Sequence, residues 1–145
     1  MYADELLTSA MHDKFKSLEL HSYLRPATKW VTEELVYKLT KKIFKDYHVI
    51  YQYRPFFLKS SFGGQMSYDV YISGLKIAIE YQGQQHFEPI DFFGGIDGFN
   101  KLIIRDAEKL KLSKANGIKL VYINYWEEVT EALIKKRINE EIEAT

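Results

Sequence analysis

The chain contains no cysteine, which excludes disulfide bonds and every zinc site built from thiolates. Its 20 basic and 20 acidic side chains give a formal net charge of zero, so any nucleic-acid surface has to be a local patch. No apolar run approaches the roughly 20 residues of a membrane span. The N-terminal sequence also carries acids where a signal peptide needs bases and an apolar block. These absences predict a cytoplasmic protein that does not associate with a membrane.

The composition predicts a folded chain. Of the 145 residues, 46% are hydrophobic and 15% are aromatic, which is enough to build the core of one domain. Apolar residues recur at helical spacing over residues 3–20, and Pro26 predicts a break after that helix. We therefore expect an N-terminal helical arm over residues 1–28 and a main domain over residues 29–145.

The hydrophobic pattern of the main domain predicts three helices and four strands. The predicted helices cover residues 30–46, 97–115 and 127–143, and the predicted strands cover residues 49–54, 68–72, 75–81 and 119–124. Asp97 is the expected N-cap of the central helix, which Asn116 and Gly117 should end. This order of elements indicates an α/β (α+β) fold, in which helices pack on the faces of a mixed sheet.

Polar residues gather at the end of an otherwise apolar strand. Side chains alternate across a strand, so Glu80 and Gln82 share one face with Ala78. Asp69 lies in the preceding strand, and a hairpin over residues 68–82 would bring it close to Glu80. Two carboxylates that converge in this way suit a hard divalent cation, which prefers oxygen ligands. The competing interpretations are a strand end that enters solvent and a surface aspartate.

The helix predicted after Gly94 and Gly95 carries an acid on its expected buried stripe. Asp106 follows Ile103 by three residues and precedes Leu110 by four, which places all three on one face. A carboxylate on a buried face is costly unless it is paired or binds a ligand. Arg105 and Lys109 lie one turn apart on the adjacent face, and the alternative is that they are ordinary surface bases.

Two glutamates near the start of the helix over residues 30–46 differ in the face they occupy. Glu33 shares its face with Val36 and Thr40 at the margin of the apolar stripe, whereas Glu34 shares its face with Lys38. If one of the two is functional, we expect it to be Glu33. The alternative is that both are acids that favour the first turn of a helix.

Taken together, these residues resemble the PD-(D/E)xK nuclease signature in its variant with glutamine in place of the final lysine. Asp69 is followed after ten residues by Glu80-Tyr81-Gln82. The string IAIEYQGQQHF, a Gly-Gly loop and RDxxK resemble more specifically the branch of the very-short-patch-repair endonuclease and the EDxHD-type phage homing endonucleases. The resemblance covers about residues 30–125, and the branch's functional positions would be Glu33, Asp69, Gln82, His86 and Asp106. The chain departs from some relatives in lacking a zinc-binding cysteine module.

The resemblance implies a restriction-endonuclease-like fold that hydrolyses phosphodiester bonds in DNA with Mg²⁺ or Mn²⁺. Asp69, Glu80 and the carbonyl of Tyr81 would hold the metal, and Gln82 would orient water or bind phosphate. By the same resemblance, His86 would act as a general acid or base. Glu33 and Asp106 would hold a second metal ion or position His86. Arg105 and Lys109 would contact DNA phosphates.

Two other functions remain open from the sequence. One is a catalytically decayed nuclease fold that binds DNA, which the glutamine at position 82 favours. The other is a domain that binds a protein partner. Cleavage of both strands commonly needs two active sites, so a homodimer or a larger protein assembly is also open.

Overall fold

The chain folds into a four-stranded mixed sheet with helices on both of its faces. This computed structural model describes residues 19–144, with the main chain alone for residues 19–30 and Phe92. The order of elements is α2 (Glu19–Ile43), β1 (Val49–Tyr53), β2 (Tyr68–Ile72), η2 (Ser73–Leu75), β3 (Ile77–Gln82), η3 (Gln84–His86), η4 (Asp91–Phe93), α3 (Gly95–Ala115), β4 (Lys119–Asn124) and α4 (Glu131–Glu143). The predicted α+β class is confirmed. No helix in this part of the chain has both the length and the apolar character needed to cross a bilayer.

The strands lie in the order β1-β2-β3-β4, so neighbours in the sequence are neighbours in the sheet. β1 pairs antiparallel with β2, and β2 pairs antiparallel with β3, which confirms the predicted hairpin. β4 pairs parallel with β3 because α3 carries the chain back across the sheet between them. The parallel register places Glu80 beside Tyr122 and Gln82 beside Asn124.

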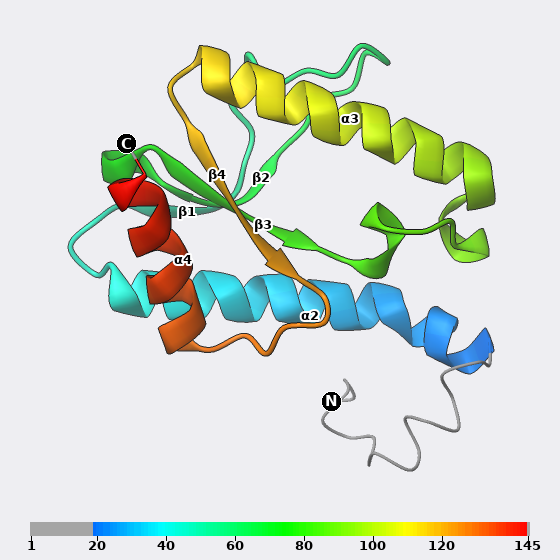
Figure 1. Cartoon of the computed structure of the whole chain (residues 1–145), viewed down its shortest axis with the longest axis horizontal. Helices are drawn as coiled ribbons and strands as arrows, with labels where there is room; N and C mark the ends of the chain where they lie inside the picture. The colour runs from blue at the N-terminus through cyan, green and yellow to red at the C-terminus, as the bar shows by residue number, and fades with distance from the viewer. Residues whose placement is uncertain (1–18, 145) are drawn as a thin grey trace.

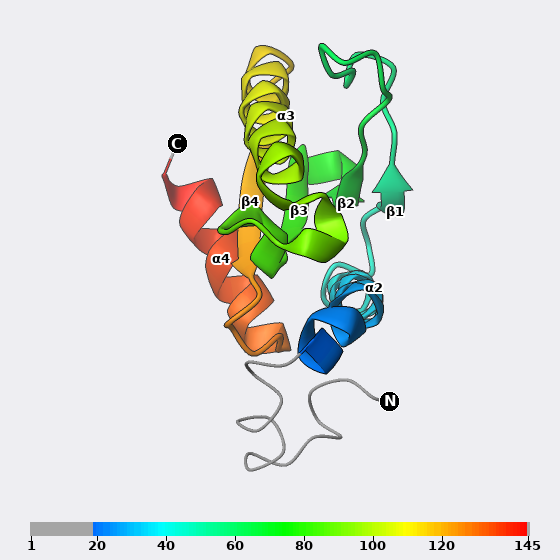
Figure 2. The ribbon, with the colours of Figure 1, turned by 90° about the vertical axis from the view of Figure 1, so that its right-hand side faces the viewer.

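The helices form one layer on each side of the sheet. Figure 1 shows α3 crossing above the strands, with α2 and α4 below them. The view turned by 90° separates the same layers and shows the connection from β1 to β2 rising beside α3 (Figure 2). On the α2 and α4 side, the core contains Val36, Ile79, Ile134 and Ile138. On the α3 side, a second cluster of buried residues includes Tyr68, Tyr71, Ala78 and Leu120.

Three predicted helix boundaries are wrong. α2 continues through Pro26, where the sequence predicted a break, although proline supplies no main-chain N–H to the helix. α3 begins at Gly95 rather than at an N-cap formed by Asp97, because Gly94 adopts a left-handed conformation with φ of 92° and turns the chain into the helix.

α4 begins at Glu131, where the Thr130 hydroxyl accepts the Leu133 N–H at 3.1 Å and caps the helix. The predicted helix over residues 3–20 falls almost entirely outside the described residues.

The rotation of α3 about its axis also differs from the prediction. Ile103 and Leu110 were expected to face the core, yet they are 46% and 41% exposed. Lys109 and Ser113 take the inward face, because Lys109 pairs with Glu80 and the Ser113 hydroxyl lies 2.6 Å from the Tyr68 hydroxyl. Polar pairings therefore set the face that α3 turns to the sheet.

The core on the α2 and α4 side should be sensitive to truncation. Ile138 is fully buried, so Ile138→Ala should lower the free energy of unfolding by about 2–5 kcal/mol through lost burial and a residual cavity. Ile104→Ala makes the same change at a side chain that is 45% exposed, and it should alter stability by less than about 1 kcal/mol. Urea unfolding of both variants measures the two effects, and equal losses would contradict the assigned core.

Candidate active site

Asp69 and Glu80 each bind the main chain of the other's strand. The Asp69 N–H donates to Glu80 Oε2 at 2.8 Å, and the Tyr81 N–H donates to Asp69 Oδ2 at 2.8 Å. We call this reciprocal pair of bonds the carboxylate crossover. It takes over where the regular pairing of β2 with β3 ends, one position beyond Val70 and Ile79. The two acids that the sequence placed close together therefore lie side by side.

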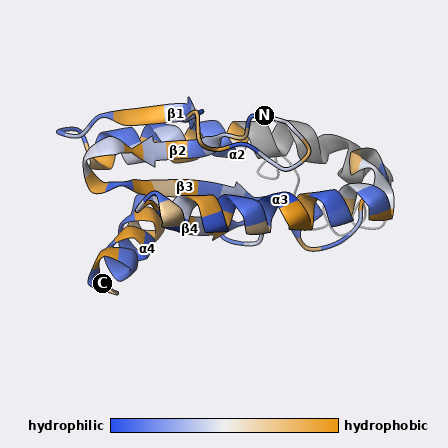
Figure 3. Cartoon of the chain, turned by 90° about the horizontal axis from the view of Figure 1, so that it is seen from above, coloured by the Kyte–Doolittle hydropathy of each residue, from blue (hydrophilic) through white to orange (hydrophobic). Residues whose placement is uncertain are grey.

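The carboxylate crossover lies where the sheet becomes polar. β3 changes from hydrophobic to hydrophilic toward its carboxyl end (Figure 3). Every residue of β3 is buried, and Glu80 itself is only 6% exposed. A strand that lies beneath α3 thus carries its polar residues into the interior, which excludes the alternative of a strand end that enters solvent.

A lysine from α3 completes the contacts of Glu80. Lys109 Nζ lies 2.5 Å from Glu80 Oε1 and donates to the carbonyl of Ser67 at 2.7 Å. Burial alone would lower the pKa of Lys109, but the charge and hydrogen bond of Glu80, together with the charges of Asp69 and Asp106, outweigh burial and raise that pKa. Lys109 is therefore a charged, internal partner of the acids and not a surface base.

Asp69 lies among like charges. Burial, and then the negative charges of Glu80 and Glu33, raise the pKa of Asp69 well above its ordinary value of 3.8. Glu33 is 3% exposed and accepts a hydrogen bond from Gln52 Nε2 at 2.9 Å. Glu34 instead faces solvent and pairs with Lys38 at 3.2 Å. Glu33, and not Glu34, therefore lies buried beside Asp69, and a functional role for Glu33 stays a prediction.

The structure also brings His86 and Asp106 together. His86 Nδ1 lies 2.8 Å from Asp106 Oδ2, and the side chains are 11% and 33% exposed. η3 supplies the histidine, and α3 supplies the aspartate one turn before Lys109. A carboxylate on Nδ1 fixes the orientation of the ring and directs Nε2 away from that carboxylate.

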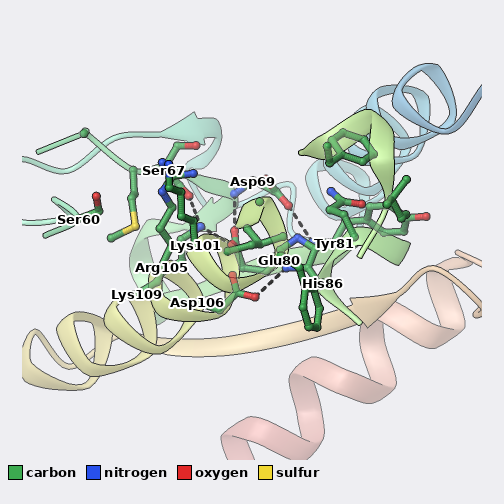
Figure 4. A pocket seen from close by; sticks show the side chains of 18 of the residues that line it. Ser60, Ser67, Asp69, Glu80, Tyr81, His86, Lys101, Arg105, Asp106 and Lys109 are labelled. Atoms are coloured by element: carbon green, nitrogen blue, oxygen red, sulfur yellow. Dashed lines mark hydrogen bonds and ion pairs between the residues drawn. The ribbon is translucent and has the colours of Figure 1, made fainter. Parts of the chain in front are cut away.

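A cavity of about 570 Å³ joins these groups. Figure 4 shows the carboxylate crossover, the Lys109 contacts and the His86–Asp106 pair around one space. α3 lines one wall with Lys101 and Arg105, and Arg105 also lies over the Phe62 ring at 5.5 Å from its centroid. The connection between β1 and β2 supplies further lining residues, and Glu108 of α3 joins this connection to the helix by accepting the Ser61 N–H at 3.1 Å.

Gln82 is not brought to the cavity. Its side chain is 8% exposed, and the residues that line the cavity include Gln85 but not Gln82. The sequence missed Gln85 because the period-two rule of a strand stops at Gln82, and the turn η3 that follows has no comparable pattern. The sequence also did not predict the direct contact of Lys109 with Glu80, because Lys109 points inward only in the observed rotation of α3 about its axis.

The donor set suits a hard divalent cation in part. Among the side chains that the structure describes, no group of three or more His, Asp or Glu residues is arranged to hold a metal ion. Mg²⁺, however, is commonly held by one or two carboxylates together with water and substrate phosphates. Asp69 Oδ1 accepts no hydrogen bond from any described residue. Asp69 and Glu80 therefore offer carboxylate oxygens of the kind that Mg²⁺ and Mn²⁺ bind, and Tyr81 lines the same cavity.

Comparisons with known proteins give one partial match. No protein-family model matches the chain, and no solved structure matches it. The chain is similar to "Uncharacterized protein 094L" of Frog virus 3 (isolate Goorha), with 37% identity over 76 residues. The match covers 51% of this chain and 49% of that protein, so the chain spans about half the length of this relative. The printed name states no activity.

The raised pKa of Asp69 makes the stability of the fold depend on pH. The native state binds a proton at Asp69 at higher pH than the unfolded chain does, so the free energy of unfolding falls as pH rises from 3.8 through the raised native pKa. Asp69→Asn removes this loss, while its amide oxygen still accepts the Tyr81 N–H. We expect it to be more stable than the wild type at about pH 8, with a difference that shrinks as pH falls.

Denaturant unfolding over this pH range, with a chelator present, measures the difference. Asp46→Asn, at an exposed position, is the control. A stability gain for Asp69→Asn that is the same at every pH would show that the Asp69 charge is not its cause.

Proposed function

We propose that the chain is a metal-dependent endodeoxyribonuclease with a restriction-endonuclease-like fold and a PD-(D/E)xK site. The observation that carries the proposal is the carboxylate crossover at the floor of a cavity. Two adjacent strands bring a buried pair of acids together, and such a pair is costly unless a cation offsets its charge. The mixed sheet between helical layers agrees with the fold that the resemblance implies.

The metal site would use Asp69, Glu80 and the carbonyl of Tyr81. Mg²⁺ or Mn²⁺, when bound, would polarise the scissile phosphate and lower the pKa of a coordinated water. The raised pKa of Asp69 supports this assignment, because a cation beside the carboxylate would favour its charged form. Glu33 adds negative charge beside Asp69.

Lys109 would take over the role that the resemblance gave to position 82. Its ammonium group already touches Glu80, and hydrogen bonds to Glu80 and to the Ser67 carbonyl fix its place. From there it can stabilise charge on the phosphate or orient the attacking water, which a Gln82 side chain outside the cavity cannot do. The lysine would thus come from α3 rather than from the strand.

His86 would act as the general acid or base, with Asp106 as its positioning residue. A proton on Nδ1, donated to Asp106, leaves the lone pair on Nε2 to take a proton from water or return it to the leaving oxygen. Arg105, at the mouth of the cavity, would contact DNA phosphates. With no net charge to hold DNA non-specifically, a homodimer or a larger assembly would extend this contact.

The proposal predicts cleavage that depends on both acids. The protein with Mg²⁺ or Mn²⁺ should cut at least one form in a panel of single-stranded, duplex, nicked and flapped DNA. Asp69→Asn and Glu80→Gln should each lower the rate by about 100-fold or more, because loss of the metal removes several kcal/mol of transition-state stabilisation.

The same variants test whether a cation binds. Mg²⁺ at about ten times its dissociation constant should stabilise the wild type by ~1.4 kcal/mol in thermal unfolding, and it should not stabilise Asp69→Asn. Stabilisation without cleavage of any DNA form would favour a catalytically decayed module. Neither stabilisation nor cleavage would favour a domain that binds a protein partner.

The two neighbouring glutamates of α2 provide a matched pair. Glu33→Ala removes a buried charge beside Asp69 and should lower the cleavage rate by about tenfold or more, since ~1.4 kcal/mol corresponds to a factor of ten. Glu34→Ala removes a solvent-facing charge and should leave the rate within about twofold. Single-turnover rates, measured where both variants are folded, give the comparison. Equal losses would rule out the assignment of Glu33 to the site.

A further inference from the structure

Gln85 is a largely buried residue whose amide reaches the cavity and has no hydrogen-bond partner among the described residues. It is 8% exposed, lies in η3 and lines the cavity. No described residue forms a hydrogen bond with its amide, and its amide atoms are not fully enclosed, so they are open to the cavity. An amide in this position can exchange hydrogen bonds with cavity water for hydrogen bonds with a ligand. A ligand in the cavity would supply the missing partner.

A glycine fixes where this amide lies. A Cβ added to Gly83 would be 2.4 Å from Gln85 Oε1 and 3.2 Å from its Nε2, so the amide rests against the Gly83 main chain. Gly83 has φ of −68° and ψ of 173°, which an alanine adopts without strain. Position 83 therefore requires glycine because a side chain there would collide with the Gln85 amide. The backbone conformation at position 83 does not require glycine.

From this placement we infer that the Gln85 amide binds a phosphate oxygen of the nucleic-acid strand in the cavity. This inference rests on the proposed function. Glutamine is one of the neutral donors that commonly bind phosphate oxygens. His86 is the next residue of the same turn and lines the same cavity, while Lys109 and Arg105 reach it from α3. A neutral donor binds phosphate there without competing with Lys109 for the carboxylate of Glu80.

The first test compares two adjacent glutamines. Gln85→Leu should weaken binding of a DNA oligonucleotide by about 10- to 100-fold, measured with Ca²⁺ in place of Mg²⁺, and should slow cleavage at sub-saturating DNA by a similar factor. Gln84→Leu is the control. Gln84 does not line the cavity, and its amide donates to Glu88, so this variant should bind and cleave as the wild type does.

The second test moves the amide without removing it. Gly83→Ala should weaken binding and cleavage because its Cβ displaces the Gln85 amide. In the Gln85→Ala background the same change should have no further effect, because the methyl group enters vacated space. Losses that multiply in the double variant would show that Gly83 acts independently of Gln85 and would overturn the inference.

The third readout separates a phosphate contact from a base contact. On a pool of randomised duplexes, loss of a phosphate contact weakens cleavage evenly across sequences, whereas loss of a base contact relaxes the preference at one position. An even loss for Gln85→Leu supports the inference, and a loss confined to one base overturns it. If the wild type cleaves and Gln85→Leu matches it, only this inference fails. If the wild type neither binds nor cleaves DNA, the proposed function fails with it.

Discussion

The site depends on the carboxylate crossover between β2 and β3. An antiparallel pair of strands normally satisfies its main-chain N–H groups with carbonyls of the neighbouring strand. At the end of this pair, the Glu80 side chain accepts the Asp69 N–H and the Asp69 side chain accepts the Tyr81 N–H instead. The strands therefore stay joined while their carboxylates are held in the cavity floor. Because the acids are part of the sheet's own hydrogen bonding, their positions are as fixed as those of the strands.

Fixing the acids there leaves a charge that the fold only partly offsets. Lys109 neutralises Glu80, and the Glu80 charge in turn raises the pKa of Lys109. The charge of Lys109 also acts on Asp69 and lowers its pKa, but burial and the carboxylates of Glu80 and Glu33 outweigh it and raise that pKa. The contact between Lys109 and Glu80 also fixes α3 on the sheet, so the same interaction sets one wall of the cavity and turns Ile103 outward.

Local patterns in the sequence predicted the parts of this site that follow from regular geometry. β4 has the predicted bounds, and strand alternation with a hairpin was enough to place Asp69 beside Glu80. Helical periodicity was enough to prefer Glu33 over Glu34. The rotation of α3 was not predictable in this way, because its apolar residues occur on two faces and buried polar pairings decide between them. Gln85 was missed because it lies in a short turn, where neither period applies.

The charges at the carboxylate crossover help to distinguish a metal-dependent active site from a module that only binds DNA. With Asp69 and Glu80 ionised, Lys109 balances one of these two buried charges. A surface that only binds DNA gains nothing from acids placed there, because they repel the phosphate backbone. A divalent cation offsets the remaining charge and attracts a phosphate to the carboxylates. The free energy spent on burying Asp69 is therefore understandable if a cation and a phosphate meet at this place, and it is unexplained if they do not.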